Sequence, residues 1–179
     1  MNIDLVPIGD KSYEQKAMPI QITKISNKEN QEVITQLIEY AKAHKLQSIS
    51  APVLGINSRI IIFKIKTRYE VFVNPVIIEQ GEEKFDDWEN CLAVNNGQTY
   101  GLVPRHVWIE ISGLDKHGKR FSLKLKDKLA ASFQHQRDHL EAKFFMQRIK
   151  KSDLKYLVNK TEFDKCKSHL PKCGKTEII

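Results

Sequence analysis

Cysteine is scarce in this chain, and the signals of export and membrane insertion are missing. The 179 residues include 3 cysteines, and a small odd number argues against a framework of disulfide bonds. No segment approaches the roughly 20 consecutive apolar residues that a transmembrane helix needs. The first residues show no basic region followed by an apolar stretch, which a signal peptide contains. We therefore expect a cytoplasmic protein with no membrane-inserted part.

A concentrated basic region is also missing, although the chain is basic overall. Lys and Arg number 29 against 22 Asp and Glu, which gives a net charge of +7. The basic residues are spread along the chain, and they do not alternate with aromatic residues in the way that favours specific nucleic-acid binding. Such a charge favours weak attraction to a polyanionic surface such as the ribosome. We predict no specific nucleic-acid ligand.

Length and apolar content indicate one compact domain. Apolar residues make up 41% of the chain, which is enough for a single hydrophobic core at this length. We predict one domain over residues 1–165 and a flexible C-terminal tail over residues 166–179. Cys166, His169 and Cys173 have a spacing that allows a second metal site, although free thiols are the simpler interpretation.

Hydrophobic patterning predicts a helix, then several strands, then a second helix. Apolar residues recur at helical spacing after Asn27, which predicts a helix over residues 28–46. β-branched and aromatic residues dominate five short segments, which we predict to be strands: 59–66, 70–74, 76–80, 107–111 and 120–125. Helical spacing returns over residues 127–149. This order predicts an α+β fold of mostly antiparallel strands.

The second predicted helix carries two histidines, His135 and His139. Residues four apart lie on one face of a helix, so both imidazoles can reach one metal ion. In the H-E-x-x-H motif of zinc hydrolases, the Glu takes a proton from the attacking water. Here that position is Gln136, whose amide can form hydrogen bonds but cannot accept the proton. Cys91 is a better candidate for the third ligand than Asp138, which points to a different side of the helix.

Three segments, in the right order and spacing, resemble the signature motifs of peptide deformylases. Residues 46–53 (LQSISAPV) resemble G-x-G-L-A-A-x-Q, residues 89–93 (ENCLA) resemble E-G-C-L-S, and residues 134–140 (QHQRDHL) resemble Q-H-E-x-D-H-L. The similarity extends over about residues 3–150. Members of this family remove the formyl group from N-formylmethionyl chains. The resemblance implies a peptide-deformylase-like fold, with mostly antiparallel sheets around a central metal-binding helix.

The resemblance also implies a metal centre. Cys91, His135 and His139 match the family's ligands for one divalent ion. That ion is commonly Fe²⁺ in the family, and Zn²⁺ or Ni²⁺ can occupy the site; one thiolate and two imidazoles suit all three metals. Glu89 and Asp138 are candidate acceptors for the remaining imidazole N–H groups.

Further positions match residues that contact substrate in the family. The backbone N–H of Leu92 is expected to bind the formyl oxygen, and Ser48 and Ile49 to lie beside the peptide backbone. Ala131 and Ser132, four and three residues before His135, are expected to line the methionine pocket. The implied ligand is an N-formylmethionyl or other N-terminal peptide. Some family members dock at the ribosome, so ribosome association is a further expectation.

The sequence departs from the family motifs at positions that take part in the family's reaction. Gln136 replaces the general-base Glu, and Val53 replaces a Gln whose side chain helps to stabilise the oxyanion. Ser48 also replaces a motif glycine, as does Leu46. We therefore predict a metal-binding protein with impaired or absent hydrolysis of N-formylmethionyl peptides, one that binds N-terminal peptides. The alternative is an active metal-dependent peptide deformylase, and a third interpretation is a structural protein with no metal.

Overall fold

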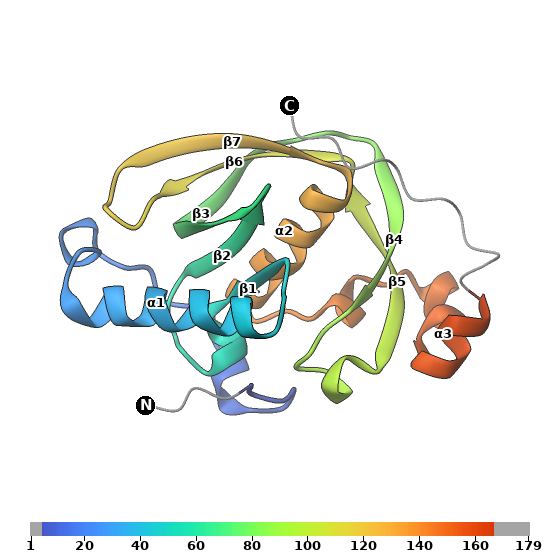
Figure 1. Cartoon of the computed structure of the whole chain (residues 1–179). Coiled ribbons are helices and arrows are strands. Elements are labelled where there is room, and N and C mark those ends of the chain that lie inside the picture. Colours follow the sequence, from blue (N-terminus) through green and yellow to red (C-terminus); the bar gives the residue numbers. More distant parts are fainter. Residues whose placement is uncertain (1–4, 167–179) are drawn as a thin grey trace.

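The computed structural model describes residues 5–166, which form two antiparallel sheets around a buried helix (Figure 1). The helices and strands are, in chain order, α1 (Lys28–Ala43), β1 (Ser48–Ser50), β2 (Ile60–Ile65), β3 (Arg68–Gln80), β4 (Lys84–Asn90), β5 (Thr99–His106), β6 (Trp108–Leu114), β7 (Arg120–Lys126), α2 (Asp127–Leu140), β8 (Val158–Asn159) and α3 (Lys160–Cys166). The larger sheet has the order β1-β2-β3-β6-β7, and the smaller one β4-β5-β8. The predicted α+β class is confirmed.

Helix α1 covers one face of the larger sheet, and it begins where the sequence predicts. The side chain of Asn27 accepts a hydrogen bond from the backbone N–H of Asn30 at 2.9 Å, which caps the helix. Ile34, Leu37 and Ala41 are buried against the sheet. The helix ends at Ala43 rather than at residue 46, because Lys45 has a positive φ of 53°. A left-handed residue of this kind terminates a helix.

Strand β3 joins two segments that the sequence predicts as separate strands. Its pairing with β6 shifts register between Val73 and Val76, around a residue with positive φ, Asn74, and a proline, Pro75. Proline cannot donate a ladder hydrogen bond, so strands tolerate it at bulges. The Asn74 side chain instead exchanges two hydrogen bonds with the backbone of Ile20. The predicted turn between β6 and β7 is confirmed.

Helix α2 lies between the two sheets (Figure 1), and most of its side chains are buried. Leu129, Phe133 and Leu140 pack into the core together with Phe63 and Phe72 of the larger sheet. The helix stops at Leu140, nine residues before the predicted end at 149, and Ala142 there has a positive φ of 55°. Because α2 is buried, its polar side chains, His135 and His139 among them, lie in the interior of the protein.

Strands β4 and β5 form the wall opposite α2, and the hydrophobic pattern does not predict them. In β4, residues 84–90 (KFDDWEN), the inward side chains are acidic: Asp87 and Glu89 are buried, and Asp86 points outward. The two-residue period of a strand places Asp87 and Glu89 on one face. This face looks onto α2 and builds the site described below.

The chain after α2 returns to the smaller sheet. Strand β8 pairs with β5, and Phe163 of α3 stacks on Tyr100 with ring centroids 4.2 Å apart. Residues 167–179 lie outside the described part of the chain, and so do His169 and Cys173, whose spacing with Cys166 allows a second metal site. The division at residue 165 stays a prediction. Among residues 5–166, no helix combines the length and the apolar character that crossing a membrane requires.

Candidate metal centre

The three predicted ligands meet in the interior. The sulfur of Cys91, directly after β4, lies 3.3 Å from Nε2 of His139, and that nitrogen lies 3.2 Å from Nε2 of His135. All three side chains are buried, and their ligand atoms lie within 4.8 Å of one another. Ligands at about 2.0–2.3 Å from one tetrahedral ion stand roughly 3.3–3.8 Å apart. The arrangement therefore fits a single divalent ion.

The charges at the site favour metal binding as well. Burial raises the pKa of the Cys91 thiol, but the adjacent imidazoles of His139 and His135 outweigh burial and bring the pKa down to about 5. Cys91 is therefore in the thiolate form that binds metals. Burial lowers the pKa of His135, and hydrogen bonds to Cys91 and Glu89 outweigh it and raise the pKa to about 10. Metal binding must displace this proton from the imidazole.

Glu89 orients the first histidine. Its Oε2 accepts a hydrogen bond from Nδ1 of His135 at 2.8 Å, which leaves Nε2 facing Cys91 and His139. Arg105 of β5 holds the same carboxylate with two N–H donors at 2.6 and 2.9 Å. Burial raises the pKa of Glu89, and the bonds to Arg105 and His135 outweigh it, so that the pKa falls to about 2. Glu89 is therefore the imidazole acceptor that the sequence suggests.

Asp138, the other suggested acceptor, has two arginines rather than an imidazole as its hydrogen-bond partners among residues 5–166. It accepts a hydrogen bond from Arg105 at 2.7 Å and another from Arg148 at 2.6 Å. Adjacent helix residues point about 100° apart, and Asp138 lies on the side of His139 that faces Arg105 and Arg148. Asp138 instead anchors Arg105, which in turn anchors Glu89. This buried chain of charges was not predicted, because its members lie far apart in the sequence.

We expect Glu89→Gln to weaken metal binding about 10- to 100-fold, the usual effect of removing a carboxylate that orients a histidine ligand. The amide cannot match the charge of the carboxylate that accepts from His135. Competition with a chromophoric chelator measures the zinc affinity, and circular dichroism checks that the variant is folded. Glu82→Gln, at an exposed position in the turn before β4, is the matched control. Equal zinc affinities in the two variants would contradict this role of Glu89.

A cavity of about 440 Å³ opens beside the three ligands, and most of the predicted substrate residues line it. They are Ser48, Ile49, Val53, Leu92, Ser132 and Gln136. Ala131 is the exception: it is buried and does not line the cavity. The α2 side chains that line the cavity lie on the helix face that carries Ser132 and His139. Ala131 points about 100° away from its neighbour Ser132 and so leaves this face.

Gln136 is the buried side chain of most chemical interest in this cavity. It lies next to His135 on α2, and its Oε1 has no hydrogen-bond partner among residues 5–166. A buried polar atom without a partner is uncommon, and this one is available to a water or a ligand. Val53, also buried, contributes only an aliphatic surface. Neither side chain can transfer a proton at neutral pH.

The buried helix α2, between two antiparallel sheets, brings together a Cys-His-His cluster with the geometry of a metal site in an α+β fold. A model of the polypeptide deformylase family matches residues 3–155. The peptide deformylase of Pelotomaculum thermopropionicum is 30% identical over 161 residues, covering 88% of this chain and 97% of that protein. Peptide deformylase 2 of a Nostoc species is 32% identical over 163 residues, covering 83% of this chain and 88% of that protein.

Solved structures agree with the family model. The crystal structure of a peptide deformylase from Synechococcus elongatus in complex with actinonin has a TM-score of 0.76 at 26% identity, covering 91% of this chain and 85% of that one. The chain therefore belongs to the peptide deformylase family. This finding confirms the resemblance of the three motifs.

Proposed function

We propose that this protein is a metal-dependent deformylase of N-formyl peptides in which the chemical step is slow. The single observation that carries the proposal is the position of Gln136, buried beside three intact metal ligands with its Oε1 unpartnered among residues 5–166. The ligands support a working metal centre. The amide supports a loss of proton transfer at that centre.

The comparisons favour the alternative prediction, an active deformylase, over impaired or absent hydrolysis. The relatives carry the name peptide deformylase, and nothing in these comparisons indicates a loss of activity. We therefore take N-formyl peptide hydrolysis as the reaction, with formate as the product. We infer the slow rate only from Gln136, which cannot accept a proton, and from Val53, which cannot donate a hydrogen bond.

The chemistry divides between the ion and the side chains. When bound, a divalent ion at Cys91, His135 and His139 supplies Lewis-acid activation of water and of the formyl carbonyl. We assign the backbone N–H of Leu92, at the cavity wall, to the formyl oxygen. Val53 cannot add a second hydrogen bond to that oxygen.

The missing groups set the scale of the loss. Proton transfer by a positioned carboxylate contributes about 10²–10⁴ in rate, and Gln136 cannot provide it. One donor to the oxyanion contributes about 10²–10³, and Val53 cannot provide that. The two losses do not simply multiply, because groups that act in one transition state are not additive.

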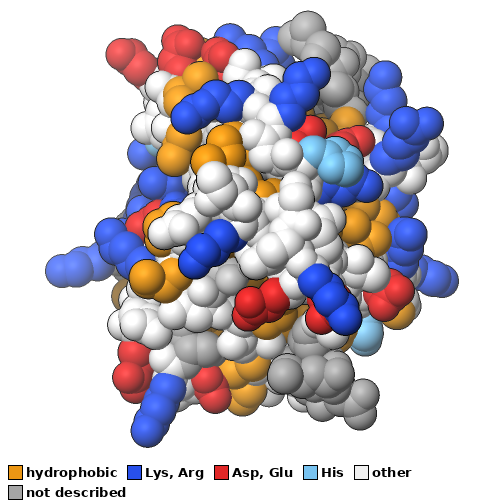
Figure 2. Space-filling view, turned by 90° about the vertical axis from the view of Figure 1, so that its left-hand side faces the viewer, with side chains coloured by type: hydrophobic (Ala, Val, Ile, Leu, Met, Phe, Trp, Pro, Cys, Tyr) orange, Lys and Arg blue, Asp and Glu red, His pale blue; other side chains and the backbone are white. Residues whose placement is uncertain are grey.

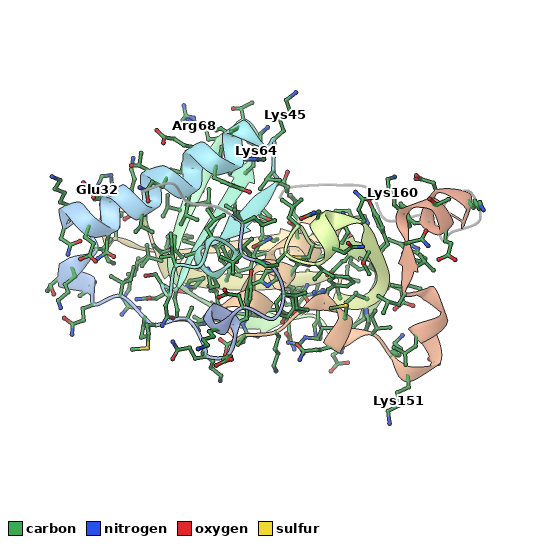
Figure 3. The ribbon with its side chains drawn as sticks, turned by 90° about the horizontal axis from the view of Figure 1, so that it is seen from below. Glu32, Lys45, Lys64, Arg68, Lys151 and Lys160 are labelled. Carbon is green, nitrogen blue, oxygen red and sulfur yellow. The ribbon has the colours of Figure 1, made fainter. Side chains whose placement is uncertain are left out.

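Ribosome association and a cytoplasmic location remain predictions. Figure 2 shows Lys and Arg side chains scattered over the visible face, among acidic and uncharged ones, without one continuous basic surface. In Figure 3, Lys151 and Lys160 project from the C-terminal segments in different directions, and Lys45, Lys64 and Arg68 belong to another part of the molecule. The distribution supports weak, unspecific attraction to a polyanion.

Metal-dependent peptide binding tests the proposal. We expect the zinc-loaded protein to bind an N-formyl tripeptide in isothermal titration calorimetry, and chelator treatment to abolish the binding. Cys91→Ala removes a ligand, and we expect it to lose both the bound zinc and the peptide affinity. If the peptide bound equally well to the parent protein and to Cys91→Ala, the Cys-His-His centre would not be the peptide site.

A further inference from the structure

An ion pair and a pair of hydroxyls line the same cavity as the metal ligands. Lys128 of α2 forms an ion pair with Asp87 of β4, and Oγ of Ser48 lies 2.8 Å from Oγ of Ser132, joined by a hydrogen bond. All four residues line the cavity of about 440 Å³. Part of the cavity wall is therefore polar beyond the metal ligands themselves, and the proposed reaction gives these four side chains no role.

The ion pair lies along β4 and α2 on the N-terminal side of the residues that hold the metal centre. Asp87 stands two residues before Glu89 on the inward face of β4, and Lys128 stands seven residues before His135 on α2. Seven residues make about two helical turns, or roughly 10 Å. The Asp87–Lys128 pair thus joins β4 to α2 about two helical turns from the Glu89–His135 pair, which joins the same two elements. Ser132 lies between the two levels on the same helix.

The exposure of the two partners indicates which one meets a ligand. The Asp87 side chain is 7% exposed, whereas that of Lys128 is 38% exposed. An ammonium group has three N–H donors, so Lys128 can bond to Asp87 and still donate to a ligand. The two serine hydroxyls add a donor and acceptors nearby.

The polar part of the cavity wall favours some ligand side chains over others, according to their polarity and charge. An apolar side chain that fills the cavity removes water from Lys128 and from the hydroxyls without replacing the lost hydrogen bonds, which is unfavourable. A side chain with a carbonyl oxygen replaces them. A carboxylate would lie close to Asp87, and two like charges repel each other. A neutral side chain with a hydrogen-bonding end fits the wall best.

We propose that this cavity takes the first side chain of the N-formyl peptide and selects a neutral, hydrogen-bonding one, such as that of glutamine, over the apolar side chain of methionine. The two side chains have similar length and shape, so polarity makes the difference. The inference rests on the proposed function, because it names the substrate class of the same site. Lys128, Asp87 and Ser132 are its specificity-determining residues.

Paired peptides test the selection. We expect zinc-loaded parent protein to bind formyl-Gln-Ala-Ser about tenfold or more tightly than formyl-Met-Ala-Ser, because unpaired polar groups in a binding site disfavour an apolar ligand strongly. Calorimetry measures both dissociation constants, and mass spectrometry confirms that the formyl groups are still attached at the end. The formyl group also prevents cyclisation of the terminal glutamine.

A double variant tests the assignment to the ion pair. Asp87→Leu with Lys128→Met makes this part of the wall apolar, and we expect the preference to reverse in favour of the methionine peptide. Replacing both partners leaves neither charge of this ion pair without the other, so we expect folding to be retained. Asp86→Leu with Lys150→Met is the matched control, since it removes an ion pair of the same composition from an exposed position next to Asp87. We expect the control to keep the preference of the parent.

Ser132→Ala provides a milder test that preserves the charges, and we expect it to reduce the preference for glutamine severalfold. A parent protein that binds the methionine peptide more tightly overturns the inference and leaves the proposed function standing. An unchanged preference in the double variant also overturns it. If neither peptide binds to the zinc-loaded parent, the proposed function fails together with the inference.

Discussion

Gln136→Glu should raise kcat/KM for an N-formyl peptide by about 10²–10⁴, the contribution of a positioned general base. The new carboxylate would stand beside His135, where the amide oxygen of Gln136 now has no hydrogen-bond partner among residues 5–166. A carboxylate there can take a proton from the attacking water and pass it to the leaving amine. The amide can do neither.

The effect of Val53 should appear only after the base is restored. Adding Val53→Gln to Gln136→Glu provides a second donor to the oxyanion, and we expect a further gain of about 10²–10³. Val53→Gln alone should gain much less, because groups of one catalytic unit are not additive.

Formate release by the parent, both single variants and the double variant, at equal metal content, measures these gains. Gln136→Met is the matched control, since it has the length of the Gln136 side chain but no hydrogen-bonding end. It should not exceed the parent. If Gln136→Glu failed to exceed the parent while binding both metal and peptide, the amide at position 136 would not limit the rate.

Arg105→Met should lower the free energy of unfolding by about 3–5 kcal/mol, the cost of breaking a buried ion pair from one side. Arg105 is 3% exposed and joins Glu89 to Asp138. Without the guanidinium, Glu89 loses two of its hydrogen bonds in the interior. Urea denaturation in the presence of a chelator measures the difference free of bound metal. Arg68→Met, at an exposed position of β3 (Figure 3), is the control and should change stability by less than about 0.5 kcal/mol.

The same comparison should depend on pH in a defined direction. In the parent, the pKa of Glu89 falls from 4.5 to about 2, because its bonds to Arg105 and His135 outweigh burial. A carboxylate whose pKa is lower in the folded than in the unfolded protein stabilises the fold at pH values above its unfolded-state pKa. This stabilisation is lost as the pH falls towards its folded-state pKa. The gap between the parent and Arg105→Met should therefore narrow as the pH falls from about 4.5 towards 2. A gap that widened over this range would contradict the role of the Arg105–Glu89 pair.

The sequence identifies the three side chains that cluster in the interior because their signal is local. His135 and His139 lie one helical turn apart, and Cys91 lies within a short motif, so spacing and motif order identify all three. Helix α1 and the β6–β7 turn are predicted for the same reason. The ends of the helices are predicted less well. Lys45 and Ala142 stop α1 and α2 in left-handed conformations that their side chains do not favour.

The parts that the sequence could not predict depend on distant contacts. Strand β4 was missed because its inward residues, Asp87 and Glu89, are acidic and do not give an apolar pattern. Asp87 and Lys128 are 41 residues apart, and Arg105 and Asp138 are 33 apart. These pairs come together only because β4 and β5 pair antiparallel with each other and pack against α2. The two-residue period from Asp87 to Cys91 was the one signal that could have indicated a shared face.

The chemical step in a single turnover tests the central claim most directly. Metal-loaded protein in excess over a formyl-Met or a formyl-Gln peptide binds all of the peptide, so the rate of formate release reports hydrolysis rather than affinity. We predict that the parent protein releases formate at least about 10² more slowly than Gln136→Glu with Val53→Gln at the same metal content. Equal rates in the two proteins, with either peptide, would contradict the account and would establish an active deformylase that works without a carboxylate at position 136.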